Sequence, residues 1–148
     1  MMARLLHHLR RNDAGSMLIE FALLAPVFML MLVGVFQAGM AYQNYNAIRS
    51  LSADAARYVM IEYQKNNNVS REEIRAVVMA MGRESPYLLQ AEQLDVDVEY
   101  ADTSRISGTR EIDIEIAYAP SDYLNVPALD FLTLTYSRPV FVVAPSHP

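Results

Sequence analysis

The chain contains 148 residues with no Cys and no Trp, and its 12 basic and 17 acidic residues give a formal net charge of -5. This length suits one domain of about 100 to 150 residues, so no second large catalytic domain is expected. The lack of cysteine excludes a disulfide scaffold and thiolate zinc or iron–sulfur sites. An acidic chain with a pI of about 5.1 is also expected to be a poor nucleic-acid binder.

An apolar run separates a basic N-terminal segment from an acidic remainder. The first fifteen residues contain three basic side chains and one acid: Arg4, Arg10, Arg11 and Asp13. No charged residue lies between Glu20 and Arg49, and residues 21–36 carry only apolar side chains, one glycine and one proline. A helix over the roughly 22 residues 21–42 is about 33 Å long, enough to cross a hydrocarbon core of about 30 Å.

These lengths and charges predict a basic leader at 1–15, a membrane-spanning helix at 16–42 and an exported domain at 43–148. The leader is expected in the cytoplasm, because short cytoplasmic segments are enriched in Lys and Arg. A secretory signal peptide is an alternative, since Gly39, Met40 and Ala41 fit a small-x-small cleavage site, although the run exceeds the usual apolar core of about 7–15 residues. A buried helix of a soluble domain is disfavoured because the run lacks an amphipathic period.

Glu20 lies at the cytoplasmic edge of the apolar run, where a carboxylate is costly. Two interpretations follow from its position alone. Glu20 is either a functional residue with a positive partner, or it is solvated in the headgroup layer.

The residues around Glu20 carry a family resemblance. Residues 13–21, DAGSMLIEF, resemble the processing site of type IV prepilin-like proteins, in which a basic leader ends in Gly and Glu occupies the fifth mature position. Residues 20–26, EFALLAP, and residues 55–58, AARY, resemble the TadE-like pseudopilin family of Tad (tight adherence) pilus systems. The resemblance is close over about residues 10–60 and weaker in the strand-rich C-terminal part.

The resemblance implies that a prepilin peptidase cuts between Gly15 and Ser16. The new Ser16 amine would pair with Glu20 of a neighbouring subunit and set the register of packed helices, with Phe21 and Pro26 in the same assembly segment. Pro26 either allows local melting of the helix or is a passive bend. Cleavage removes three basic residues and one acid, so the mature net charge is (12 - 3) - (17 - 1) = -7.

The resemblance also implies a minor pilin or pseudopilin that acts in the assembly of a Tad (Flp) type IV pilus and in adhesion. The expected location is the bacterial inner membrane, with a single pass, a cytoplasmic N-terminus and a periplasmic C-terminal domain; incorporation into the pilus is left open. The expected partners are the prepilin peptidase, other Tad minor pilins, the major Flp pilin, the inner-membrane assembly platform and membrane lipid. No nucleic acid, small-molecule substrate, cofactor or metal is expected.

Periodicity predicts two helices after the apolar run. Small and apolar residues recur at three- and four-residue steps, which extends the first helix from about Leu18 to Gln64: Tyr45, Ile48, Leu51, Ser52, Ala55 and Val59. Ser70 and Glu73 form a capping box for a second helix with an apolar stripe, which Gly82 and Pro86 are expected to end. A further short turn of helix is expected within 87–93.

After residue 93 the apolar period becomes two, which predicts an antiparallel hairpin and a third strand at about 132–143. Pro139 makes the third strand an edge or bulged strand. The fold class is therefore α+β: a long N-terminal helix, a short helix and a small antiparallel sheet of about three strands, as in pilins.

The hairpin predicts an acidic face. The expected register pairs Glu99 with Glu111, and a shift by two residues keeps the same strip of six carboxylates: Asp95, Asp97, Glu99, Glu111, Asp113 and Glu115. The strip is either a docking surface for a basic partner, a weak divalent-cation site, or a solvated face that discourages aggregation. Arg110 would partly neutralise it, as would Arg138 if a bulge turns that side chain outward.

No catalytic constellation emerges, because His7 and His8 lie in the leader and His147 lies next to the end of the sequence. The chain is therefore expected to be no enzyme but a substrate of one. Two other function classes stay open. One is a singly anchored envelope protein whose acidic sheet binds a basic partner or cation, and the other is a secreted factor cleaved near Ala41.

Overall fold

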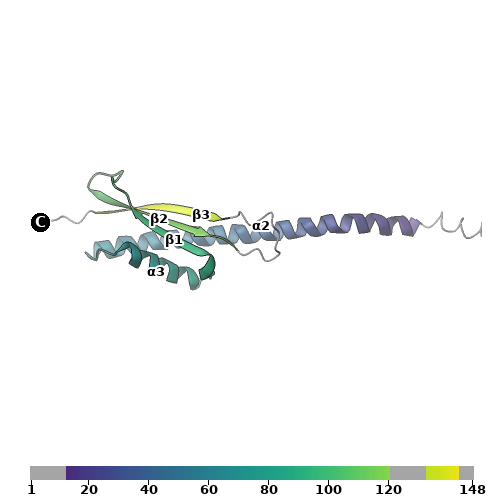
Figure 1. Cartoon of the computed structure of the whole chain (residues 1–148), viewed down its shortest axis with the longest axis horizontal. Coiled ribbons are helices and arrows are strands. Elements are labelled where there is room, and N and C mark those ends of the chain that lie inside the picture. The colour runs from purple at the N-terminus through teal and green to yellow at the C-terminus, as the bar shows by residue number, and fades with distance from the viewer. Residues whose placement is uncertain (1–12, 121–132, 144–148) are drawn as a thin grey trace, which may run out of the picture. The chain divides into compact units, whose positions relative to one another are not determined.

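The structure is a computed structural model that describes residues 13–120 and 133–143. Its elements in chain order are two α-helices, a single 3-10 turn and three strands: α2 (Asp13–Gln64), α3 (Arg71–Arg83), η1 (Ala91–Gln93), β1 (Leu94–Tyr100), β2 (Thr109–Tyr118) and β3 (Leu134–Val143). The strands form one antiparallel sheet in the order β1-β2-β3 (Figure 1). The α+β architecture predicted from the sequence is confirmed.

The chain divides into two compact units, one ending at Met40 and one starting at Ala41. In the first unit the described residues belong to helix α2, and their large apolar side chains are exposed. An apolar window of this helix is long enough to cross a membrane and is not buried inside the protein, which suggests a single-pass membrane anchor.

Helix α2 begins at Asp13, five residues before the predicted start near Leu18, and ends at Gln64 as predicted. No proline lies in residues 13–17, and the one glycine there costs only about 1 kcal/mol in a helix. The first turn can therefore form upstream of the apolar run.

The second unit packs both helices on one face of the sheet. The predicted stripe of α2 is buried, apart from Tyr45, which is partly exposed. It joins α3 and the inward side chains of the strands in one core: Ile48, Leu51, Ala55, Ala56, Val59, Val69, Ile74, Val78, Leu89, Leu94, Val96, Val98, Ile112, Ile114, Ile116, Tyr118, Val140 and Val142. The alternation of apolar and polar residues thus sets one sheet face against the helices, and leaves the other, here called the outer face, uncovered by them.

Helix α3 starts at the predicted cap, since the Glu73 backbone N–H donates to Ser70 Oγ at 3.2 Å. Gly82 was predicted to end the helix but lies inside it. A Cβ added at Gly82 would lie 2.6 Å from Leu94 Cδ2 and 3.1 Å from Leu51 Cδ2. Gly82 therefore allows α3, α2 and β1 to approach closely.

Both edge strands of the sheet carry features that hinder pairing with a further strand. The Ala101 N–H donates to the Glu111 carbonyl at 3.1 Å, so odd-numbered residues of β1 face β2 and even-numbered ones face the open edge. There, the N–H groups of Val96 and Val98 donate to the carboxylates of the preceding residues, Asp95 and Asp97, at 3.0 and 2.9 Å. These contacts occupy donors that another strand would need.

The same parity places Pro139 on the open side of β3, where its missing N–H removes one edge donor. The prediction of an edge strand is confirmed. The pairing of β2 with β3 is continuous through Pro139, so the alternative of a bulge is wrong.

Candidate functional site

The predicted cleavage bond lies near the start of α2. Gly15 and Ser16 are helical and exposed, and a Cβ added at Gly15 would meet no atom within 4 Å. The backbone at this bond is therefore open to an approaching protein on the side of the missing Cβ.

The predicted assembly residues lie on the same helix. Glu20 and Phe21 are exposed, and Pro26 lies inside α2. Proline has no backbone N–H, so the carbonyl four residues earlier, at Ala22, loses its helical donor. The structure places Glu20 four residues from Ser16 on one helix, which is about one turn.

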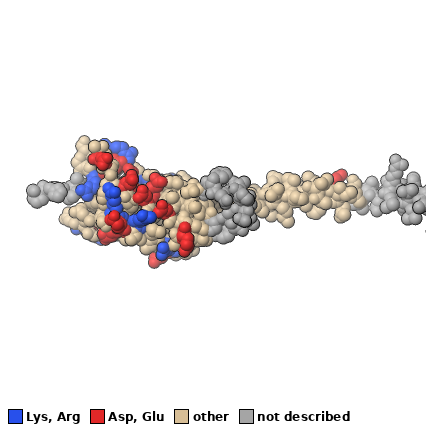
Figure 2. Space-filling view, in the orientation of Figure 1, with Lys and Arg blue, Asp and Glu red and all other residues tan. Residues whose placement is uncertain are grey.

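The acidic face forms on the outer face of β1 and β2, but its register differs from the predicted one by two residues. Asp97 lies opposite Glu115 and Glu99 opposite Asp113. Each is a like-charge pair in direct cross-strand contact, which is destabilising. Figure 2 shows that the charged side chains concentrate on the unit starting at Ala41, with basic atoms among the acidic ones.

Glu111 does not belong to an open acidic strip, which corrects the prediction for this residue. Its side chain is 3% exposed, because the loop between β1 and β2 folds over it. The Arg105 backbone N–H donates to Glu111 Oε2 at 2.9 Å and the Arg105 Nε–H to Oε1 at 2.6 Å. The bond from the Arg105 side chain, followed by the bond from its backbone, holds the pKa of Glu111 below its ordinary value.

Asp95 is also paired, through an exposed 2.8 Å ion pair with Arg75 of α3. The carboxylates of the face without an ion pair to any described residue are Asp97, Glu99, Asp113 and Glu115. Within residues 13–120 and 133–143, no group of three or more His, Cys, Asp or Glu side chains is arranged to hold a metal ion. The described face offers carboxylate charge without a cation-binding geometry.

The two arginines expected to neutralise this face point to the helix side instead. Arg138 lies opposite Ile114 in the inward row, where its Nε–H donates to Ser52 Oγ at 3.3 Å and an Nη–H to Tyr136 Oη at 3.2 Å. The Arg110 guanidinium lies 5.7 Å from the centre of the Tyr100 ring. Without a bulge, the alternation of the strands keeps both side chains inward.

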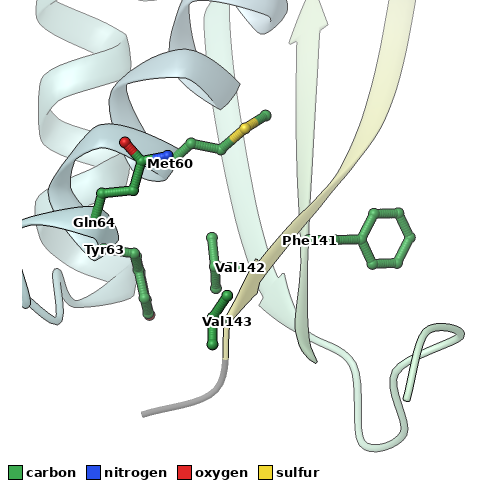
Figure 3. A pocket seen from close by; sticks show the side chains of 6 residues that line it. All are labelled: Met60, Tyr63, Gln64, Phe141, Val142 and Val143. Atoms are coloured by element: carbon green, nitrogen blue, oxygen red, sulfur yellow. The ribbon is translucent and has the colours of Figure 1, made fainter. Parts of the chain in front are cut away.

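A small apolar hollow lies between the end of α2 and the end of β3. It has a volume of about 160 Å³ and six lining residues: Met60, Tyr63, Gln64, Phe141, Val142 and Val143. Figure 3 shows Val142 and Phe141 pointing to opposite sides of the strand. The Phe141 ring lies 5.6 Å from the Arg105 guanidinium carbon, so it supports the closed Arg105–Glu111 contact on the outer face.

Tyr87 links the segment after α3 to α2, because its hydroxyl donates to the Asp54 carboxylate. Burial raises the pKa of Tyr87 to about 12, and the Asp54 hydrogen bond and charge act in the same direction. Periodicity does not reveal this contact or those of Arg75 and Arg105, since each joins residues from different elements. The inward position of Arg138 does follow from strict alternation with Tyr136 and Val140.

The sequence model of one family, described as TadE-like protein, matches residues 15–57. No curated protein and no solved structure matches the chain. The matched segment starts at Gly15 and extends through the apolar run into the buried stripe of α2. The TadE-like resemblance is confirmed over these residues, and it suggests a protein associated with Tad pili.

Proposed function

We propose that this chain, which is TadE-like over residues 15–57, is a minor pilin or pseudopilin that a prepilin peptidase cuts after Gly15 and that then acts in the assembly of a Tad type IV pilus. The TadE-like match is the observation that carries this proposal. The exposed apolar part of α2 supports it, because a helix with no protein cover needs lipid or neighbouring helices around it.

In this proposal the chain is a substrate and structural component, not an enzyme. The leader 1–15 stays in the cytoplasm and the unit beginning at Ala41 lies in the periplasm, in line with the basic residues that precede the apolar run. Cleavage requires the peptidase to unwind the first turn of α2 around Gly15. Glycine lowers the cost of that unwinding, since it is the least favourable helix residue after proline.

After cleavage, the amine of Ser16 and the carboxylate of Glu20 carry opposite charges about one helical turn apart. A Glu20 carboxylate in a lipid environment needs a positive partner, and the Ser16 amine of a neighbouring subunit supplies one. This pair sets the axial register of adjacent helices. The local loss of a backbone hydrogen bond at Pro26 lets the helix adjust as it packs beside neighbours.

The proposed partners are the prepilin peptidase, the other minor pilins, the major Flp pilin and the inner-membrane assembly platform. The experiment is a count of surface pili in a Tad-piliated strain from which this chain has been deleted. The proposal predicts loss of pili and their return when the full chain is supplied. Normal pilus number and length in the deletion strain would contradict a role in assembly.

A further inference from the structure

Two contacts define which end of the second unit holds its first residue, Ala41. The Tyr136 ring on β3 lies 6.2 Å from the Tyr45 ring on α2, and Arg138 donates to Ser52. Along β3, therefore, the start at Leu134 lies toward Ala41. We call this the proximal end of the unit.

The connection from α3 to β1 also lies at the proximal end. Leu94, the first residue of β1, is in the same cross-strand row as Tyr118 and Leu134. Pro86 and Tyr87 line a hollow of about 300 Å³ together with residues of α2 between Gln43 and Ser50. The segment 84–90 is therefore within about two helical turns of Tyr42, where the apolar run ends.

Leu88 in this segment is unusual in two respects. Its side chain is 72% exposed, and its φ of 52° is in the left-handed region, which favours Gly or Asn over a bulky side chain. The conformation is held by hydrogen bonds from the Leu88 N–H to the Glu84 carbonyl at 3.0 Å and from the Leu89 N–H to the Gly82 carbonyl at 2.8 Å. Leu89 is buried, so the core fixes the segment while Leu88 points outward.

Neither the backbone conformation nor exposure to water favours leucine at this position. An apolar surrounding does favour it, because burying a leucine side chain in hydrocarbon is stabilising. Two exposed or half-exposed aromatic residues of the proximal end, Tyr42 and Tyr45, are of the type enriched at membrane–water interfaces. The surrounding that fits these three side chains is the boundary between lipid headgroups and acyl chains.

Arg49 adds a charge that fits the same layer. It follows Tyr42 by seven residues, about 10 Å along the helix, and helical side chains lean toward the N-terminus. Among the described residues, the Arg49 guanidinium has no ion pair. A long side chain in this position reaches back to lipid phosphates while its stem covers apolar surface.

We infer that the proximal end of the second unit rests on the phospholipid surface, with Leu88, Tyr42 and Tyr45 at the boundary between headgroups and acyl chains and Arg49 on lipid phosphate. The inference rests on the anchoring part of the proposed function. Within residues 84–90, it assigns a lipid contact to Leu88.

The natural chain has no Trp, so one introduced Trp is an unambiguous reporter. The experiment places the full chain in vesicles of phosphatidylethanolamine and phosphatidylglycerol, some with brominated acyl chains that quench nearby indoles. The reporters are Leu88→Trp, Ile106→Trp in the loop between β1 and β2 at the opposite end, and Phe28→Trp in the apolar run. We expect strong quenching for Leu88→Trp and Phe28→Trp and none for Ile106→Trp.

The three reporters distinguish failure of the proposed function from failure of the lipid contact alone. If Phe28→Trp is not quenched, the chain is not anchored and the proposed function fails with the inference. If Phe28→Trp is quenched but Leu88→Trp behaves like Ile106→Trp, the lipid contact alone is overturned. Shielding of Leu88→Trp that appears only at high protein-to-lipid ratio would indicate contact between copies and would also overturn it.

A second variant guards against disturbed folding by the indole. The chain has no Cys, so Leu88→Cys carries a single thiol, matched by Ile106→Cys. With a charged, membrane-impermeant maleimide, we expect Leu88→Cys to react at least tenfold more slowly in vesicles than Ile106→Cys. Equal rates at both positions would contradict the insertion of Leu88.

Discussion

Arg105 binds both carboxylate oxygens of Glu111, one through its backbone N–H and the other through its guanidinium. This contact covers one of six predicted surface carboxylates, Glu111, which is buried although the Arg105 side chain stays exposed, and it folds the loop between β1 and β2 onto the outer face. The ion pair between Arg75 of α3 and Asp95 of the same sheet leaves both side chains exposed. The two pairs therefore make a matched comparison.

We predict that Arg105→Ala lowers the thermal midpoint of the detergent-solubilised chain more than Arg75→Ala does. Arg105→Ala leaves buried Glu111 with only the hydrogen bond from the backbone N–H of residue 105. Arg75→Ala removes an exposed ion pair, which is worth only about 0–1 kcal/mol. Because the pKa of folded Glu111 is lowered, its stabilisation is present above the ordinary glutamate range and is lost as pH falls through the lowered value. Circular-dichroism melts across the acidic range measure both effects, and equal midpoints for the two variants would contradict the closed-pair interpretation.

The Tyr87–Asp54 contact predicts a change in stability at alkaline pH. The folded pKa of Tyr87 is raised from 10.0 to about 12, so its contribution is complete below about pH 10 and is lost as pH rises toward 12. Tyr87→Phe should cost about 1 kcal/mol at neutral pH and flatten the stability profile between about pH 10 and 12. If Tyr87→Phe keeps the parent's slope of stability against pH in that window, another group causes the loss. Tyr58→Phe is the control variant, because burial also raises the pKa of Tyr58.

Gly82 predicts a packing effect. Alanine is favoured over glycine in a helix by about 1 kcal/mol, but the added methyl group would overlap Leu94 Cδ2 at 2.6 Å. Overpacking in a core costs about 1–3 kcal/mol, so Gly82→Ala should be neutral to destabilising by up to about 2 kcal/mol. A denaturant titration measures the free energy of unfolding, and Leu94→Val in the same chain should recover part of any loss. A gain in stability for Gly82→Ala alone would contradict the close approach.

Substitution of Glu20 tests its proposed role in setting the register of adjacent helices, and we expect it to leave cleavage unaffected. Glu20→Ala should still lose its leader but should fail to support piliation, because the Ser16 amine of a neighbour then has no carboxylate partner. Gln37→Ala, at the other polar position of the apolar run, should leave piliation unchanged. Normal pilus number and length with Glu20→Ala would remove the register role.

The sequence predicted the elements and most of the core because periodicity is a local property. The end of α2, the cap at Ser70 and the inward row of β2 all follow from residue spacing. The register between β1 and β2 could not be predicted this way, since a shift of two residues keeps every apolar side chain on the same face. The observed register depends on how the intervening loop closes, and Arg105 anchors that loop to Glu111.

The position of Arg138 could have been predicted. Alternation from Tyr136 through Val140 places it inward, and the outward expectation depended on a bulge at Pro139 that the continuous pairing does not contain. The contact of Tyr87 with Asp54 and the exposure of Leu88 were beyond prediction, because they depend on the path of an irregular segment. For residues 13–26, the resemblance to TadE-like proteins was sufficient to indicate the match that begins at Gly15.

Removal of the first fifteen residues by a prepilin peptidase is the step on which the proposed function depends. Intact mass and N-terminal sequencing of the membrane-derived protein test it most directly, with Gly15→Leu as the uncleavable control. We expect a mature chain that begins at Ser16 and a Gly15→Leu chain that retains its leader. A native chain beginning at Met1 or Met2, or near Tyr42, would contradict it.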